Sequence, residues 1–151
     1  MNINEFLDHL NQGLTVTAGS EIHRFMIEVS NEAMRLTAEL NNVYHTPEEI
    51  RTLMEKITGK PVHQSFTMFP PFYTDCGKNI TIGKNVFINA GCKFQDQGGI
   101  TIGDGALIGH NAVLATLNHD LAPSMRSNLH RLPLKLGKMH GLVLMQPYFP
   151  V

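Results

Sequence analysis

The spacing of apolar positions differs between parts of the chain, and the first part ends near residue 61. Before that point, apolar residues recur at intervals of three and four, which is the period of an amphipathic helix. Ser20 is a good N-cap residue. The apolar face that follows it consists of Ile22, Phe25, Met26, Val29, Ala33, Leu36 and Leu40. This pattern predicts a long helix that begins after Ser20 and buries one side.

A second helix start lies in the string HTPEEI. Thr46 suits the N-cap, Pro47 suits the first helical position, and Glu49 completes a capping box. The apolar stripe that follows is Ile50, Leu53, Met54 and Ile57. Gly59 then ends the helix. Residues 1–61 are therefore predicted to form an N-terminal helical segment.

From residue 80 onward the period is six. The strings ITIGKNVFIN (80–89) and ITIGDGALIG (100–109) are two copies of one pattern, 20 residues apart. Large apolar residues occupy every sixth place, with a two-residue insertion between the copies: Ile82, Ile88, Phe94, Ile102, Ile108 and Leu114. Small residues follow several of them four places later: Val86, Cys92, Ala106 and Ala112. Six such hexads in register predict a parallel β-helix, in which Gly, Asn and Asp form the corners.

These motifs resemble the hexapeptide-repeat sugar O-acetyltransferases, the maltose and galactoside acetyltransferase group. The resemblance covers roughly residues 21–130 and depends on FPPFYTDCGKNITIGKNVFIN and on the Asn-His-Asp of LNHD. It implies a mainly β fold, with a left-handed parallel β-helix and an active-site loop over residues 62–130. It also implies a homotrimer with active sites between neighbouring subunits, and acetyl-CoA as co-substrate. Neither the hand of the coil nor the trimer follows from the periodicity.

Acetyl transfer to a sugar hydroxyl needs a base that takes the hydroxyl proton, and a neutral imidazole suits this task at pH 7. By resemblance, His119 matches the family's catalytic histidine and would act in a direct transfer. Three short polar residues match acceptor-contacting positions: Asp75, Asn89 and Asp96. For Asn89 a purely structural role at a corner of the coil is an equal alternative.

Other reactive residues receive no role in the reaction. Cys92 falls on a small inward position and Cys76 has no activating neighbour. Asp120 adjoins His119, but neighbours in an extended segment seldom face each other, so no His–Asp dyad is predicted. Three further histidines are His110, His130 and His140. Their spacing does not set three imidazoles around one point, and no metal is expected.

Composition narrows the class of partner. The 151 residues suit one domain, and 12 Lys and Arg against 13 Asp and Glu give a net charge of -1. No basic run points to nucleic acid, and no apolar run reaches membrane-spanning length. The start lacks the features of a signal peptide, and two isolated cysteines fit a reducing compartment. A cytoplasmic location is therefore expected.

The last stretch, LPLKLGKMHGLVLMQPYFPV (132–151), shows no clear period. In the family, further hexads stand here, beginning with a string such as V-x-I-G-x-N-x-W-I-G. The codons of Lys138-Met139-His140-Gly141, read one base earlier, encode Asn or Asp, then Ala, then Trp or Arg. Permitted codons for the remaining residues restore a third copy of the repeat. We therefore predict that residues 131–151 are an aberrant, out-of-frame tail on a truncated chain, with a natural divergent cap as the alternative.

The sequence as a whole predicts an acetyl-CoA-dependent O-acetyltransferase that acts on a sugar hydroxyl. Because much of the family's coenzyme A site and its oxyanion donor come from later coils, cofactor-binding residues cannot be named. Two alternatives stay open. The chain could be an inactive fragment or a trimeric scaffold, or an acetyltransferase of the same fold that acts on an amine.

Overall fold

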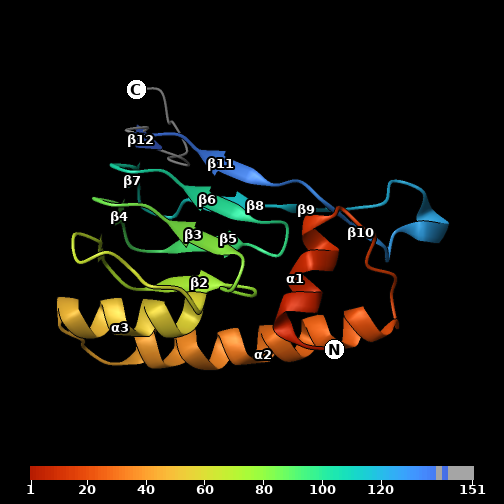
Figure 1. Cartoon of the computed structure of the whole chain (residues 1–151), viewed down its shortest axis with the longest axis horizontal. Coiled ribbons are helices and arrows are strands. Elements are labelled where there is room, and N and C mark those ends of the chain that lie inside the picture. The colour runs from red at the N-terminus through yellow and green to blue at the C-terminus, as the bar shows by residue number, and fades with distance from the viewer. Residues whose placement is uncertain (139–140, 143–151) are drawn as a thin grey trace, which may run out of the picture.

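The computed structural model describes residues 1–138 and 141–142 (Figure 1). Its N-terminal part contains three helices: α1 (Ile3–Asn11), α2 (Glu21–Asn42) and α3 (Pro47–Thr58). The Ser20 hydroxyl accepts a hydrogen bond from His23 N–H and begins α2, and the Thr46–Glu49 capping box begins α3. α3 ends at Gly59, whose φ of 66° is in the left-handed region. Both predicted helices are confirmed, whereas α1 was not predicted as a separate helix.

Most of the remaining described chain is built from short parallel strands, which form three sheets around one core. The first sheet contains β1 (Thr67–Met68), β4 (Phe87–Ile88), β7 (Leu107–Ile108) and β12 (Gly141–Leu142). The second contains β2 (Phe72–Thr74), β5 (Cys92–Gln95) and β8 (Val113–Ala115). The third contains β3 (Ile80–Ile82), β6 (Ile100–Ile102) and β11 (Leu134–Leu136). The chain visits the three sheets in turn, so it winds as a coil.

The register of this coil follows the sequence repeat. Ile88 pairs with Ile108 and Phe94 pairs with Leu114, so neighbouring strands place residues 20 positions apart side by side. The large residues of the repeat are at most 1% exposed at Ile88, Phe94, Ile102, Ile108 and Leu114, and Ile82 is partly buried. Its small residues are all buried: Val86, Cys92, Ala106 and Ala112. Burying one large apolar side chain stabilises a fold by roughly 1.5–3 kcal/mol, so the repeat is the main source of stability. The predicted parallel coil behind a helical segment is confirmed.

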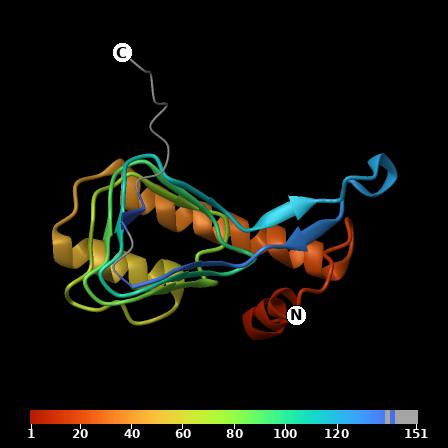
Figure 2. The same ribbon diagram turned by 90° about the horizontal axis from the view of Figure 1, so that it is seen from above.

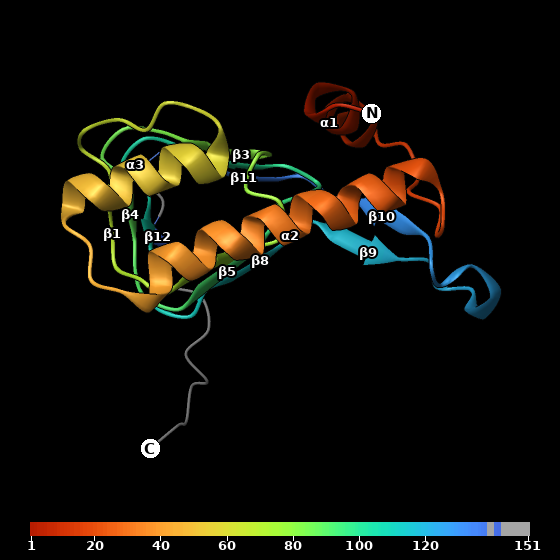
Figure 3. The ribbon, with the colours of Figure 1, turned by 90° about the horizontal axis from the view of Figure 1, so that it is seen from below.

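α2 and α3 cover the first turn of the coil (Figure 3). Leu40, Met54 and Ile57 from these helices share one buried cluster with Phe66 and Phe72 at the start of the coil. The edge strand β2 has no strand below it. Instead, the Asn41 side-chain amide accepts from Phe72 N–H at 2.9 Å and donates to Phe72 C=O at 2.8 Å. The helices therefore close the end of the coil and satisfy its open edge.

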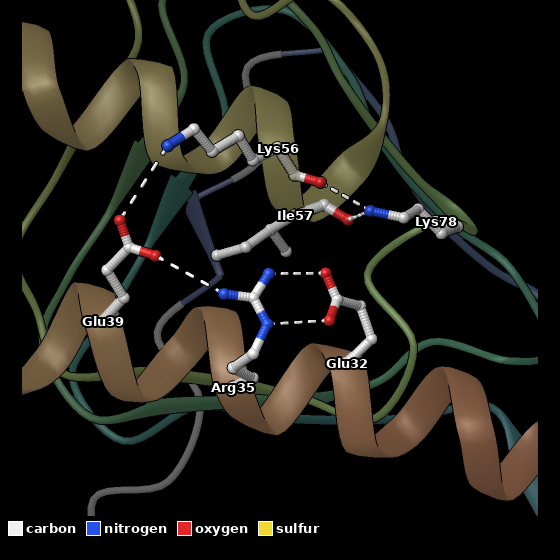
Figure 4. A network of polar contacts seen from close by, with 6 residues as sticks. All are labelled: Glu32, Arg35, Glu39, Lys56, Ile57 and Lys78. Atoms are coloured by element: carbon white, nitrogen blue, oxygen red, sulfur yellow. Dashed lines mark hydrogen bonds and ion pairs between the residues drawn. The ribbon is translucent and has the colours of Figure 1, made fainter.

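A network of polar contacts joins α2 to α3 and to the coil (Figure 4). Arg35 pairs with Glu32 at 2.7 Å and approaches Glu39, which in turn faces Lys56 at 3.9 Å. Lys78 Nζ donates to the carbonyl of Ile57 at 2.7 Å, near the C-terminal end of α3. The ion pairs are solvent-exposed, so each is worth little, and the apolar contacts beneath them hold the helices.

After β8 the chain leaves the coil as an antiparallel ribbon that projects along α2 (Figures 1 and 2). β9 (Leu117–His119) and β10 (Leu129–Arg131) pair with each other, and the loop between them contains the 3-10 turn η1 (Pro123–Met125). We refer to residues 117–131 as the His119 ribbon. This ribbon is the predicted active-site loop.

The coil extends further along the chain than predicted. β11 pairs in parallel with β6, and Leu134, Lys135 and Leu136 lie beside Ile100, Thr101 and Ile102. Leu134 and Leu136 pack against the main core. The string LKLGK at 134–138 is therefore a third copy of ITIGK at 80–84, and the repeat does not stop at residue 130. The rest of the predicted tail, residues 139–140 and 143–151, lies outside the described residues.

Candidate active site

The candidate site lies at the edge where the strands of the second sheet end. Thr74, Phe94 and Leu114 stand side by side in β2, β5 and β8. The turns after these strands therefore stack on one another, and they contain Asp75, Asp96 and Thr116. The His119 ribbon begins at this same edge. Of the residues predicted from the sequence, Asp75 lies at this edge, and His119 lies on the ribbon that leaves it.

Asp96 does not fit the predicted role of an acceptor contact. It is 0% exposed, so no acceptor molecule can reach it. Its Oδ1 accepts hydrogen bonds from Thr74 Oγ1 at 2.6 Å, Cys76 N–H at 2.9 Å and Gly77 N–H at 3.0 Å. Its Oδ2 accepts from Asn79 N–H at 3.2 Å. This carboxylate therefore organises the turn that holds Asp75, and the prediction is corrected to a structural role.

Asp75 reaches solvent from this turn and remains available to a ligand. Partial burial of its carboxyl raises its pKa, and the nearby Asp96 carboxylate raises it further, while a hydrogen bond from Gln97 opposes the shift. Gln97 itself is 5% exposed. Its Oε1 has no hydrogen-bond partner within the part of the chain that the structure describes. A buried acceptor without a donor costs stability. Because this oxygen is enclosed by the fold, it is not itself a ligand contact, and the contribution of Gln97 to the site is its hydrogen bond to Asp75.

His119 is exposed at the end of β9, where the paired strands of the ribbon meet its loop. Its Nδ1 lies 2.7 Å from the carbonyl oxygen of Arg126, across the ribbon's loop. A carbonyl can only accept, so Nδ1 carries the proton in this contact. The Nε2 atom then has a free lone pair, which is the form that a general base requires.

Asn89 lies at the opposite end of the second sheet, before β5 begins. Its Oδ1 accepts from Ala90 N–H at 2.9 Å, and its own N–H donates to Ile108 C=O. These contacts fit the corner role that was the alternative for this residue. Within one subunit, the structure does not bring Asn89 together with His119.

The other reactive side chains are placed as follows. Burial, with a smaller effect of Asp96, raises the pKa of Cys76 to about 12, so its thiol stays protonated at neutral pH. Cys92 is buried at its inward position, and burial raises its pKa as well. Asp120 does not face His119 but lies 3.2 Å from His130 across the ribbon. The described residues contain no group of three His, Cys, Asp or Glu side chains that could hold a metal ion, and His140 lies outside them.

Sequence reasoning missed Gln97 at this edge and a cleft elsewhere in the fold. Gln97 falls in the two-residue insertion between the hexads, where the period gives no information about side-chain direction. The two-residue insertion could have indicated this corner as a candidate site, because extra residues in a repeat lengthen the turn in which they fall. A cleft of about 460 Å³ between α1, α2 and the end of α3 is lined by Phe25, Glu28 and Lys60 among others. It does not include the residues of the candidate site.

No family model matches the chain. Its sequence is 30% identical over 104 residues to galactoside O-acetyltransferase of Escherichia coli, covering 68% of this chain and 51% of that protein. It is 38% identical over 71 residues to nodulation protein L of Rhizobium meliloti, covering 46% of this chain and 39% of that protein. The chain thus spans about half the length of these curated relatives, or less.

Solved structures give the same fold. A hexapeptide-repeat-containing acetyltransferase of Vibrio cholerae matches with a TM-score of 0.73 and 28% identity, over 87% of this chain and 70% of that one. A galactoside acetyltransferase in complex with coenzyme A matches with a TM-score of 0.67 and 21% identity, over 92% of this chain and 74% of that one.

Together, the coil and the histidine at its edge define a hexapeptide-repeat protein with a candidate acyl-transfer site. The relatives and structures above support a member of the hexapeptide-repeat sugar O-acetyltransferase family. Among the described residues, no helix is both long and apolar enough to span a bilayer.

Proposed function

We propose that this protein is an acetyl-CoA-dependent O-acetyltransferase that transfers an acetyl group to a sugar hydroxyl, with His119 as the general base. The contact between His119 Nδ1 and the Arg126 carbonyl is the observation that carries the proposal, because in the neutral imidazole it places the proton on Nδ1 and the lone pair on Nε2. Relatives and solved structures named as acetyltransferases support the reaction class, and the coenzyme A complex of one of them supports the donor.

In the proposed reaction, His119 Nε2 takes the proton of the sugar hydroxyl as the oxygen attacks the thioester carbonyl. A C–O bond forms and a tetrahedral intermediate develops a negative oxygen. Collapse of the intermediate breaks the C–S bond, and the proton held on His119 passes to the leaving thiolate of coenzyme A. The products are the O-acetyl sugar and free coenzyme A. The oxyanion donor and the coenzyme-binding residues are not assigned in this chain.

Asp75 is the proposed acceptor contact, because its exposed carboxylate can accept from a sugar hydroxyl. The buried Gln97 side chain donates a hydrogen bond to this carboxylate. Asp96 supports Asp75 by fixing the turn through Cys76 and Gly77. This arrangement replaces the sequence-based assignment of Asp96 as a direct contact.

The proposal includes a left-handed coil and a homotrimer. Asn89 and His119 lie at opposite ends of one sheet, so only a neighbouring subunit could place both around one acceptor. Outward-facing apolar side chains on the coil would suit such an interface: Phe69 is 59% exposed, Leu107 55% and Val113 48%. The ring of Phe69 also packs edge-on against Phe87, at 5.3 Å between centroids.

Acetyl transfer to a panel of simple glycosides, measured by release of free thiol from acetyl-CoA, tests this function. His119→Ala should lower kcat by about 10²–10⁴-fold, the usual contribution of a general base. His63→Ala, an exposed histidine on the chain between α3 and β1, is the matched control and should leave kcat unchanged. Turnover that does not depend on His119 would refute the proposal.

The same assay separates the alternatives. Absence of turnover with every acceptor, in a chain that still assembles into trimers, favours the inactive scaffold. Turnover with amines such as amino sugars but not with neutral glycosides favours the amine-specific enzyme.

A further inference from the structure

The His119 ribbon projects beyond the stacked strands and has little core of its own. All its other residues are exposed, and the partly buried ones are Leu117, Asp120, Asn128, Leu129 and Arg131. Its pairing is local, with His119 opposite Leu129 and Leu117 opposite Arg131. A two-stranded ribbon of this kind is marginally stable in isolation. Something outside the ribbon must therefore fix its position relative to the coil.

Arg131, the last residue of β10, makes contacts that leave the ribbon. Its Nε donates to the carbonyl of Gly98 at 2.6 Å. A terminal nitrogen of the same guanidinium donates to the carbonyl of Asn11, the last residue of α1. One side chain therefore joins the ribbon, the turn after β5 and the end of the first helix.

The turn that Arg131 holds contains Gln97, whose side chain donates a hydrogen bond to the proposed acceptor contact Asp75. Gly98 directly follows Gln97. The Gln97 carbonyl accepts from Asn79 Nδ2 at 2.9 Å, and the same Nδ2 reaches Asn11 Oδ1 at 3.2 Å. The two segments whose carbonyls Arg131 contacts are therefore linked to each other through Asn79. The backbone N–H of Asn79 donates to Asp96, which organises the turn that holds Asp75.

A second contact between the ribbon and the N-terminal segment is made by the backbone of Leu129. Val16 N–H donates to Leu129 C=O at 3.3 Å, and Leu129 N–H donates to Val16 C=O at 3.2 Å. The Leu129 side chain packs on a small core, separate from that of the coil, which contains Phe6, Leu10, Val16, Ile22 and Cys76. The first helix and the segment after it thus form the support on which the ribbon rests.

We propose that Arg131 is a positioning residue that holds the ribbon, and with it His119, at a fixed place relative to the turns of Asp75 and Gln97. This inference rests on the proposed function for its catalytic meaning. Its physical content, that the guanidinium anchors the ribbon to α1 and to the coil, does not depend on catalysis.

The guanidinium suits this role better than an ammonium group would. Arginine presents several N–H donors in a rigid planar fork, so it can reach the two carbonyls of Gly98 and Asn11 at once. A positive charge beside the last carbonyl of α1 is also favourable because the C-terminal end of a helix is partially negative. Lysine could replace only part of these contacts.

Hydrogen exchange on the full-length protein tests the anchor directly. The reporters are the amides of Leu129 and Asp120, which are bonded to the carbonyls of Val16 and Asn128. In Arg131→Met these two amides should exchange about 10- to 100-fold faster, with a smaller increase in Arg131→Lys. Amides within α2 and α3 should keep their rates in both variants.

Arg35→Met is the matched control, since Arg35 is exposed on α2 and bonded only to residues of its own helix. It should leave the ribbon amides unchanged. Unaltered exchange at Leu129 and Asp120 in Arg131→Met would overturn the proposal. So would a uniform acceleration that includes α2 and α3, because that result would mean general destabilisation.

Steady-state kinetics then distinguish the anchoring role of Arg131 from the proposed role of His119 as general base. In Arg131→Met, kcat should fall about tenfold or more while KM for acetyl-CoA stays unchanged, because the base is displaced and not removed. Arg131→Lys should recover part of kcat. If exchange behaves as expected but His119→Ala keeps full activity, the anchor stands and the proposed function fails.

Discussion

The coil and the His119 ribbon are stabilised in different ways. In the coil, each apolar residue of one turn packs on its counterpart 20 positions later, as Phe94 does on Leu114, so the same contact is made repeatedly. In the ribbon, position depends on a few unrepeated contacts, such as those of Arg131 and Leu129. A change in the coil should therefore lower global stability, whereas a change in the ribbon should act on position and rate.

Asp96 lies where the two regions meet, and its loss should have the largest effect on stability. In Asp96→Ala, the Thr74 hydroxyl and the N–H groups of Cys76, Gly77 and Asn79 would all lose their acceptor inside the fold. At roughly 1–3 kcal/mol for each unsatisfied buried group, partly relieved by relaxation, we expect a loss of about 4 kcal/mol in the free energy of unfolding.

Urea denaturation of Asp96→Ala measures this loss. Asp104→Ala is the control, because the Asp104 carboxylate accepts from one backbone N–H, that of Lys84, at 2.8 Å. Its substitution should cost about 1 kcal/mol. Equal losses in the two variants would show that Asp96 does not organise the turn.

Ile108 and Leu107 compare the two sides of one strand. Ile108 is 1% exposed inside the coil, while Leu107, its neighbour in β7, is 55% exposed. Ile108→Ala should lower the free energy of unfolding by about 3 kcal/mol through lost burial and a cavity. Leu107→Ala should change the free energy of the isolated subunit by less than about 0.5 kcal/mol.

The same two variants also test whether the exposed face of the coil is a subunit interface. If the exposed face is a subunit interface, Leu107→Ala should weaken association in sedimentation experiments while leaving each subunit folded. A similar loss of folding stability in both variants would contradict the assignment of inward and outward faces.

Asp75 should give a smaller, pH-dependent effect. Its pKa in the folded protein is raised, mainly by burial and then by Asp96, so the folded chain keeps a proton that the unfolded chain has already lost. The free energy of unfolding should therefore fall as pH rises from the ordinary carboxyl pKa through the raised value. Because Asp75 is largely open to solvent, the change should be small.

Thermal unfolding of Asp75→Asn across that pH range checks the sign. The variant should lose this part of the pH dependence and should be more stable relative to the wild type at pH 7 than at low pH. A steeper dependence in the variant would mean that the carboxylate is stabilised in the fold.

The DNA that encodes the last residues offers a test with no change to the protein. Leu134–Leu136 and Gly141–Leu142 both pair as strands of the coil. If the reading frame changes near Arg131 as predicted, the codons of Lys138–Gly141 read one base earlier should encode Asn-Ala-Trp and continue into a further hexad. Codons that cannot produce this string would remove the idea.

Much of the fold could be predicted because it depends on period alone. A residue such as Ile102 repeats the environment of Ile82, and Thr46, Pro47 and Glu49 encode a helix start within four positions. The site was only partly predictable. His119 was predicted from its motif. Asp96 and Gln97 lie at an inserted corner, and the period did not show that both side chains are buried there, because it does not describe the backbone geometry of an insertion.

The sequence by itself determined which side chains form the core, because regular spacing in a repeating backbone fixes the direction of every sixth residue. Only the tertiary structure decided how the ribbon is held. Asn11, Gly98 and Arg131 are far apart along the chain, and each taken alone is an ordinary residue. They are in contact because the fold brings the end of α1, the turn after β5 and the end of β10 together. A local sequence pattern does not encode such a long-range contact.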